Sequence, residues 1–285
     1  MAILRAITEW ATSPWGQDVP IHIAWFLMWV AALAGLLFLI AHAIYVRYFA
    51  KAEDFAGSVS PTLAAVLPKQ IPRHSLVARL FHWTMAAAMF TLLFTAFLPI
   101  AGVKFAWVQW HWMAGLVLIA SILFHIVHAT FFLDFWSIWV GPKDIPELKA
   151  EMLREFGHDV PGPKSGKYPL GNRLYHLAIV FTGLGASLTG ALMIPRIRTG
   201  LVARNPYYLS DATWGITYVT HGLAGVGLVG LVIAHVYFAV RPEKWWITKS
   251  MILGFITRRQ YLEHHEPSRW PVGPKGSSAK PAGHA

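Results

Sequence analysis

Long apolar stretches separated by short polar segments dominate this chain. About 20 apolar residues suffice for one helix to cross a bilayer. Five stretches reach that length, at about residues 21–46, 77–101, 106–132, 172–194 and 212–240. None of the five contains an aspartate or a glutamate. The pattern therefore predicts an all-α membrane protein with five transmembrane helices.

The polar segments divide the chain into regions. Residues 1–20 form a short lead on the outer side of the membrane, and residues 21–48 contain the first helix. Residues 74–240 contain the other four spans, which we expect to form one bundle. Residues 241–270 are predicted to be an amphipathic tail at the membrane surface. Residues 271–285 are rich in Pro, Gly, Ser and Lys and are predicted to be disordered.

Lysine and arginine positions predict the orientation. If the N-terminus lies outside, all but five of the 24 basic residues lie inside, and the five are Arg5, Lys104, Arg196, Arg198 and Arg204. Positive residues concentrate on the inner side of membrane proteins. We therefore expect a periplasmic N-terminus and a cytoplasmic C-terminus in a bacterial inner membrane. Because the first 20 residues do not resemble a signal peptide, we expect the first span to be retained.

Composition narrows the possible functions. The chain of 285 residues is 55% hydrophobic and 13% charged, as in a polytopic membrane protein. It has no cysteine, which excludes disulfides, c-type haem attachment and thiolate-bound iron–sulfur clusters in this chain. The net charge of +10 reports topology rather than nucleic-acid binding. The absence of carboxylates in the spans disfavours a cation transporter.

Two histidines on the fifth span suggest a pair of metal centres. His221 and His235 are fourteen residues apart, which is nearly four helical turns or about 21 Å. Both side chains therefore leave the same helix face, one near each side of the membrane, as two stacked b-type haems require. A well-packed helix with two hydrogen-bonded histidines is the alternative. Four glycines leave room for a flat macrocycle or a neighbouring helix: Gly222, Gly225, Gly227 and Gly230.

The other spans offer partners at matching depths. His111, near the outer end of span three, can pair with His221. His82, near the inner end of span two, can pair with His235. His125 lies fourteen residues after His111 and would reach the same inner depth, so spacing alone does not choose between His82 and His125. His176, at the start of span four, is a third candidate for the inner position.

The chain resembles a known family in the order of five short motifs: RLFHW (79–83), WHWMAG (110–115), GKYPLGNR (166–173), THGLAG (220–225) and IAHVYFA (233–239). Together they resemble the dihaem cytochrome b (gamma) subunit of membrane-bound formate dehydrogenase. They are also similar to the related cytochrome b subunits of nickel–iron hydrogenase and thiosulfate reductase. The resemblance covers about residues 74–270 and includes the tail motif GFITRRQYLEHHEPSRW (254–270). The extra first span departs from the family pattern.

The resemblance implies the site residues. It implies that the haem irons are bound by His82, His111, His221 and His235. The resemblance thus selects His82 over His125. It also implies a quinone pocket at GKYPLGNR, with Gly171 and Asn172, beside which Tyr168 adds a hydroxyl. Pro169 stands where we expect an asparagine. The alternative for Asn172 is the N-cap of the fourth span, with Arg173 at the lipid headgroups.

These observations predict a membrane-anchoring electron-transfer subunit with two haem b groups in a four-helix bundle. We expect it to pass electrons between the quinone pool and a periplasmic formate dehydrogenase-like partner. That partner would comprise a ferredoxin-like iron–sulfur subunit and a molybdenum or tungsten catalytic subunit. An anchor of a nickel–iron hydrogenase or of a thiosulfate-type reductase is the alternative. A non-redox transporter or scaffold is the remaining class.

Overall fold

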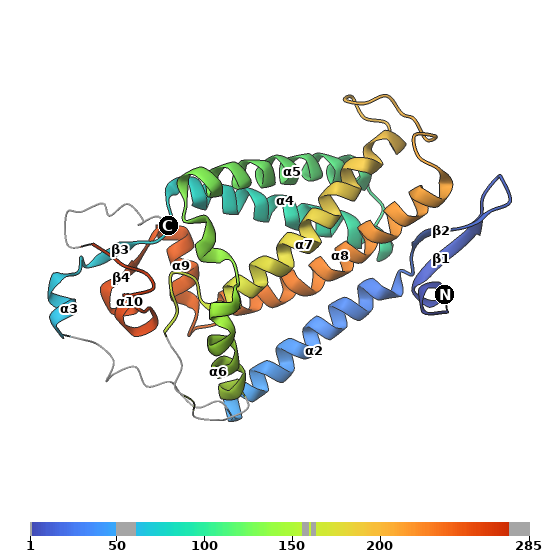
Figure 1. The fold of residues 1–285 in the computed structure, drawn as a ribbon. Helices are drawn as coiled ribbons and strands as arrows, with labels where there is room; N and C mark the ends of the chain where they lie inside the picture. Colours follow the sequence, from blue (N-terminus) through green and yellow to red (C-terminus); the bar gives the residue numbers. More distant parts are fainter. Residues whose placement is uncertain (1, 50–60, 156–159, 161–163, 274–285) are drawn as a thin grey trace. The chain divides into compact units, whose positions relative to one another are not determined.

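A computed structural model describes residues 2–49, 61–155, 160 and 164–273, and the predicted disordered tail lies mostly outside them. Among these described residues, five helices are long and apolar enough to cross a membrane, as predicted. They are α2 (Phe26–Tyr48), α4 (Leu76–Ile100), α5 (Trp107–Phe132), α7 (Leu170–Met193) and α8 (Asp211–Val240) (Figure 1). Few of their apolar side chains are buried within the protein, as in a bundle surrounded by lipid.

Contacts divide the chain into two compact units, and each long helix contributes to both. The first unit comprises Met1–Phe38, His82–His125 and Ala178–His235. The second unit comprises Leu39–Phe81, Ile126–Leu177 and Val236–Ala285. All four histidines that the resemblance assigns to haem iron fall in the first unit.

The first unit begins with a β-hairpin that the sequence pattern did not predict. After α1 (Ala2–Ile7), strands β1 (Thr8–Thr12) and β2 (Asp18–Ile23) pair antiparallel, with Thr8 opposite Ile23 (Figure 1). The turn between them uses Gly16 at a φ of 77°. The hairpin packs on α8, where the Pro20 carbonyl lies against Gly215 and the Ile23 side chain lies against Gly222. A Cβ on Gly222 would be 2.8 Å from Ile23 Cγ1, so this glycine serves the hairpin contact.

The apolar core of the first unit forms around Ile23, which is 1% exposed. Its buried members also include Met28 of α2 and Val219 and Val229 of α8. On the other side of α8, a Cβ on Gly227 would be 3.2 Å from the Thr182 methyl of α7. Glycine therefore allows α7 and α8 to approach closely. A short 3₁₀ turn, η4 (Ile194–Arg196), follows α7.

The second unit contains the segments that connect and follow the spans. They include α3 (Pro61–Val66), η2 (Phe135–Ile138), η3 (Pro142–Asp144) and α6 (Ile145–Glu155). The tail folds into α9 (Trp245–Leu253), β4 (Phe255–Thr257) and α10 (Arg258–His264). Strand β4 pairs antiparallel with β3 (Gln70–Pro72), far away in the sequence. Residues 245–264 of the predicted amphipathic tail thus fold as two short helices and a strand.

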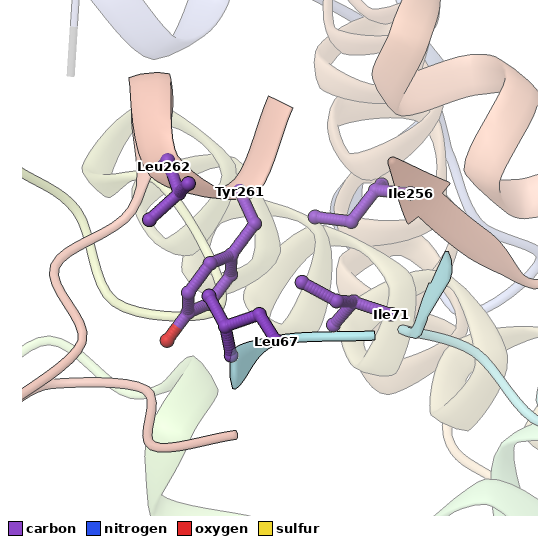
Figure 2. Close-up of a cluster of buried hydrophobic side chains, with 5 residues drawn as sticks. All are labelled: Leu67, Ile71, Ile256, Tyr261 and Leu262. Carbon is purple, nitrogen blue, oxygen red and sulfur yellow. The ribbon is translucent and has the colours of Figure 1, made fainter. Parts of the chain in front are cut away.

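A small apolar cluster holds this tail in place (Figure 2). Five buried side chains from three segments meet in it: Leu67, Ile71, Ile256, Tyr261 and Leu262. Gly254, at a φ of 92°, ends α9 and turns the chain into β4. Its carbonyl accepts the backbone N–H groups of Arg73 and His74, which extends the pairing toward α4.

A buried ion-pair network anchors the start of α7. Arg173 donates to both carboxylate oxygens of Asp144, at 2.8 and 2.6 Å. Arg269 of the tail contacts Glu147 at 2.7 Å. Arg173 therefore has a buried carboxylate partner, which contradicts the alternative in which it meets lipid headgroups. The alternative of an N-cap at Asn172 is wrong too, because α7 already begins at Leu170.

Candidate functional site

Two pairs of histidine rings face each other inside the first unit. His111 of α5 and His221 of α8 have ring centroids 6.1 Å apart, with planes at 73°. His82 of α4 and His235 of α8 have ring centroids 6.4 Å apart, with planes at 57°. The expected pairs on the predicted face of α8 are therefore brought together by the fold.

Both spacings fit one metal atom between two imidazoles. A metal–imidazole bond is about 2 Å long and a ring centre lies about 1 Å beyond the nitrogen, so trans imidazoles place their centroids roughly 6 Å apart. Two nitrogens do not complete a coordination shell. No cluster of three or more His, Cys, Asp or Glu suited to a metal ion occurs among the residues that the structure describes. The arrangement thus fits a metal whose other ligands come from a macrocycle, as in haem.

A threonine fixes the tautomer of His111. The Thr95 hydroxyl donates its own proton to the Thr91 carbonyl at 2.7 Å. It therefore accepts from His111 Nδ1–H, 2.8 Å away. With the proton on Nδ1, Nε2 carries the lone pair that a metal needs.

His221 is held in the same way by another helix. Thr189 of α7 donates its hydroxyl proton to the Gly185 carbonyl at 2.6 Å and accepts from His221 Nδ1–H at 3.0 Å. The Ala186 carbonyl is a second acceptor, 3.1 Å from the same nitrogen. A Cβ on Gly190 would be 3.3 Å from His221 Cε1, so glycine leaves room for the ring. The donor atoms of His111 and His221 are thus both prepared to bind a metal.

Space remains beside these rings. A Cβ added at Gly225, one turn after His221, would meet nothing within 4 Å. A Cβ added at Gly115, one turn after His111, would meet only Leu92, at 3.9 Å. Residues four apart share a helix face, so both glycines open space on the faces that carry the histidines. This fits a flat macrocycle between α5 and α8.

Of the three candidates for the inner position, His82 is the one whose ring contact with His235 is described, with centroids 6.4 Å apart. His125 lies on α5. His176 belongs to the second unit, where its ring packs edge-on against Trp139 with centroids 5.5 Å apart. The His82–His235 contact is tertiary, so helical spacing alone could not predict it.

The candidate quinone residues lie at the start of α7 in the second unit. The Tyr168 ring is 6.3 Å from the His74 ring, and the Lys167 ammonium is 5.5 Å from the Tyr168 ring centre. Burial raises the pKa of the Tyr168 phenol, Arg73 partly offsets this, and Asp134 adds to it. The phenol therefore stays protonated and can donate. Gly171 has open space at its Cβ position, and the Asn172 side chain is exposed.

The model of one protein family matches this chain. It describes prokaryotic cytochrome b561 and matches residues 73–254. The chain belongs to the prokaryotic cytochrome b561 family. A search of the curated proteins found no match. The matched range includes all four paired histidines, and the protein is a multi-pass inner-membrane cytochrome that binds haem b and transfers electrons.

Sequence reasoning missed Thr95 and Thr189. Each lies on a helix that carries neither member of the histidine pair it serves, so no spacing rule connects it to that pair. A threonine in a membrane helix commonly bonds its own backbone, and both do so here. Their second role depends on the tertiary approach of α4 to α5 and of α7 to α8.

Proposed function

We propose that this cytochrome b561-family protein is the dihaem, quinone-reactive membrane subunit of a formate dehydrogenase-like complex. The main support is the pair of facing histidine couples set fourteen residues apart along α8. The motif resemblance over residues 74–270 supports the type of complex. Electrons then pass between a periplasmic oxidoreductase and the quinone pool through two centres stacked along one helix.

The protein's own residues position and tune the cofactors. His111 and His221 are the proposed axial ligands of the outer haem, and His82 and His235 are those of the inner haem. Each haem, when bound, supplies a one-electron redox centre. Thr95 and Thr189 keep the Nδ1 protons of the outer pair in place, which raises the basicity of the coordinating nitrogens.

Tyr168, Gly171 and Asn172 are the proposed quinone site. The phenol and the amide can donate to a quinone carbonyl, and Gly171 leaves the backbone accessible. The proposed orientation has the N-terminus in the periplasm and the C-terminus in the cytoplasm, supported by the distribution of basic residues. A ferredoxin-like iron–sulfur subunit and a molybdenum or tungsten catalytic subunit are the proposed partners on the outer face.

Haem content tests the core of this proposal. Pyridine haemochrome analysis of the purified protein should give two haem b groups per chain, with low-spin absorption. A value of zero would leave only a transporter or scaffold, and a value of one would refute the dihaem arrangement.

Quinone-linked turnover tests the proposed quinone site. Asn172→Ala and Tyr168→Phe should raise the apparent KM for quinone or abolish inhibition by a quinone analogue, while both haems remain. Tyr207→Phe is a matched control, because Tyr207 is 84% exposed and lies in the first unit. Normal turnover and normal inhibitor sensitivity in both site variants would move the pocket elsewhere.

A cytochrome b anchor of a nickel–iron hydrogenase or of a thiosulfate-type reductase is the second candidate. It uses the same histidine pairs and differs only in its partner, and the motif resemblance extends to both. Identification of the subunits that co-purify with the protein distinguishes these complexes. A hydrogenase large subunit in that preparation would replace the formate dehydrogenase-like assignment.

A further inference from the structure

The tail of the second unit contains a pocket that the proposed electron transfer does not use. It has a volume of about 420 Å³ and lies between α9 and α10. Two indole rings and four polar side chains are prominent in its lining: Trp245, Trp246, Lys249, Arg259, Glu263 and His264. Aromatic rings beside cationic groups are typical of sites at a membrane–water boundary.

The fold gives the pocket a fixed frame. Tyr261 and Leu262 bury one face of α10 in the apolar cluster (Figure 2), and Arg259 and Glu263 line the pocket from the same helix. The capping box between Thr257 and Gln260 fixes the start of α10. On the other side, the Thr248 hydroxyl donates to the Ala239 carbonyl at 2.6 Å and ties α9 to the last turn of α8.

The charged side chains around the pocket leave an excess of positive charge. Arg259 pairs with Glu263 at 2.6 Å, so this carboxylate is already neutralised. Within the described residues, no ion pair to Lys249 is observed. Behind the pocket wall, the Arg73 guanidinium lies 5.2 Å from the Trp246 ring centre and is 3% exposed.

Arg73 adds to this excess of positive charge, because its guanidinium has few hydrogen-bond acceptors around it. Its Nη2 donates to the Lys167 carbonyl at 3.1 Å. Its Nε and Nη1 are buried without hydrogen-bond partners in the described part of the chain. Burial lowers the pKa of Arg73 to about 10, which leaves the group charged at neutral pH. A buried cation that has no carboxylate partner within the described residues extends a positive potential into the neighbouring pocket.

The position of α9 indicates that an anion bound in this pocket comes from the membrane surface. The helix begins five residues after the last residue of the fifth span, Val240. Ile252 and Leu253 are 50% and 52% exposed, and Trp245 is 39% exposed. Such side chains suit the boundary between lipid tails and headgroups.

We propose that the α9–α10 pocket binds the phosphate group of an anionic phospholipid, with Lys249 as its principal charged donor. The indole of Trp245 packs beside the glycerol region of that lipid. This site would anchor the tail to the membrane surface and does not depend on the haems.

The test uses the full-length purified protein in detergent. Its thermal unfolding midpoint is measured against increasing short-chain phosphatidylglycerol or short-chain phosphatidylcholine. A ligand of the folded state raises the midpoint in proportion to its occupancy. Phosphatidylglycerol should give a saturable rise that phosphatidylcholine does not give. Lys249→Gln should weaken the apparent affinity about fivefold, whereas Lys249→Arg should retain it.

Lys244→Gln is the matched control, because Lys244 is exposed just before α9 and does not line the pocket. It should leave the affinity unchanged, and a loss as large as that of Lys249→Gln would show diffuse charge attraction and overturn the site. Equal effects of the two lipids would overturn it as well. If inorganic phosphate at the same concentration stabilises as strongly as phosphatidylglycerol, the ligand is a free phosphate compound and the lipid assignment is wrong.

Discussion

The Thr95 hydroxyl accepts a hydrogen bond from Nδ1–H of His111 across 2.8 Å, from one membrane helix to the next. Thr189 does the same for His221 across 3.0 Å. Four helices therefore contribute to the proposed outer haem site: α5 and α8 carry the proposed ligands, and α4 and α7 carry the groups that orient them. This explains how short motifs on separate helices can act as one site.

Removal of these hydroxyls should change the outer haem without removing it. Thr95→Val and Thr189→Val keep the side-chain shape but lose the acceptor, so the imidazole becomes a weaker donor to iron and the oxidised state is less stabilised. The midpoint potential of one haem should rise. A hydrogen bond worth about 1 kcal/mol corresponds to roughly 40 mV for one electron. A spectroelectrochemical titration measures this shift.

Thr91→Val provides the control for that titration. Thr91 lies one turn before Thr95, and its hydroxyl bonds the Ala87 carbonyl of its own helix. It should leave both potentials unchanged. If Thr95→Val and Thr91→Val shift the same potential equally, the hydroxyl of Thr95 has no specific role at His111.

The inner ligand can be tested by a pair of alanine variants. His82→Ala should lose one haem per chain, because its ring faces that of His235. His125→Ala should retain two haems. Pyridine haemochrome analysis with the protein concentration measured independently gives the ratio. The reverse result would show that α5 supplies ligands to both haems.

The sequence predicts the five spans and the shared face of His221 and His235 on α8 because length and helical period are local properties. It places the first span too early, at residue 21, because Ile21 and Ile23 of β2 continue into the apolar run of α2 without a polar break. The hairpin depends on packing against Gly215 and Gly222 of α8, which is nearly 200 residues away in the chain. The fold of the tail also depends on a distant segment, because strand β4 pairs with β3.

The helix glycines should differ in their tolerance of large side chains. Gly225 lies one turn after His221, on the face that carries it, and a Cβ there meets open space. Gly225→Leu should reduce haem content by filling the space proposed for the outer macrocycle. Gly230→Leu is the control. Gly230 lies nine residues after His221 and therefore on the opposite face of the helix, and a Cβ there also meets open space. Equal haem loss in both variants, measured by absorption per chain, would contradict this placement.

Acid should weaken the second unit through His265. This side chain is fully buried, and its Nδ1–H donates to the Gly166 carbonyl at 2.6 Å. Burial and the neighbouring Arg73 lower the pKa of His265 from 6.5 to about 3. Below pH 6.5 the unfolded chain therefore binds a proton that the folded chain does not bind. The free energy of unfolding should fall by up to about 1.4 kcal/mol per pH unit as the pH decreases from 6.5.

His265→Asn tests this dependence, because its amide can still donate to Gly166 but does not titrate. The thermal midpoint should be measured between pH 5 and pH 8. The wild type should lose stability below pH 6.5, while the variant should give a flatter profile. This window lies above the ordinary range of the Asp144 carboxyl, whose pKa is lowered further by its hydrogen bond with Arg173, so that this carboxylate stays ionised throughout. Identical slopes for the wild type and the variant would show that another group controls the acid sensitivity.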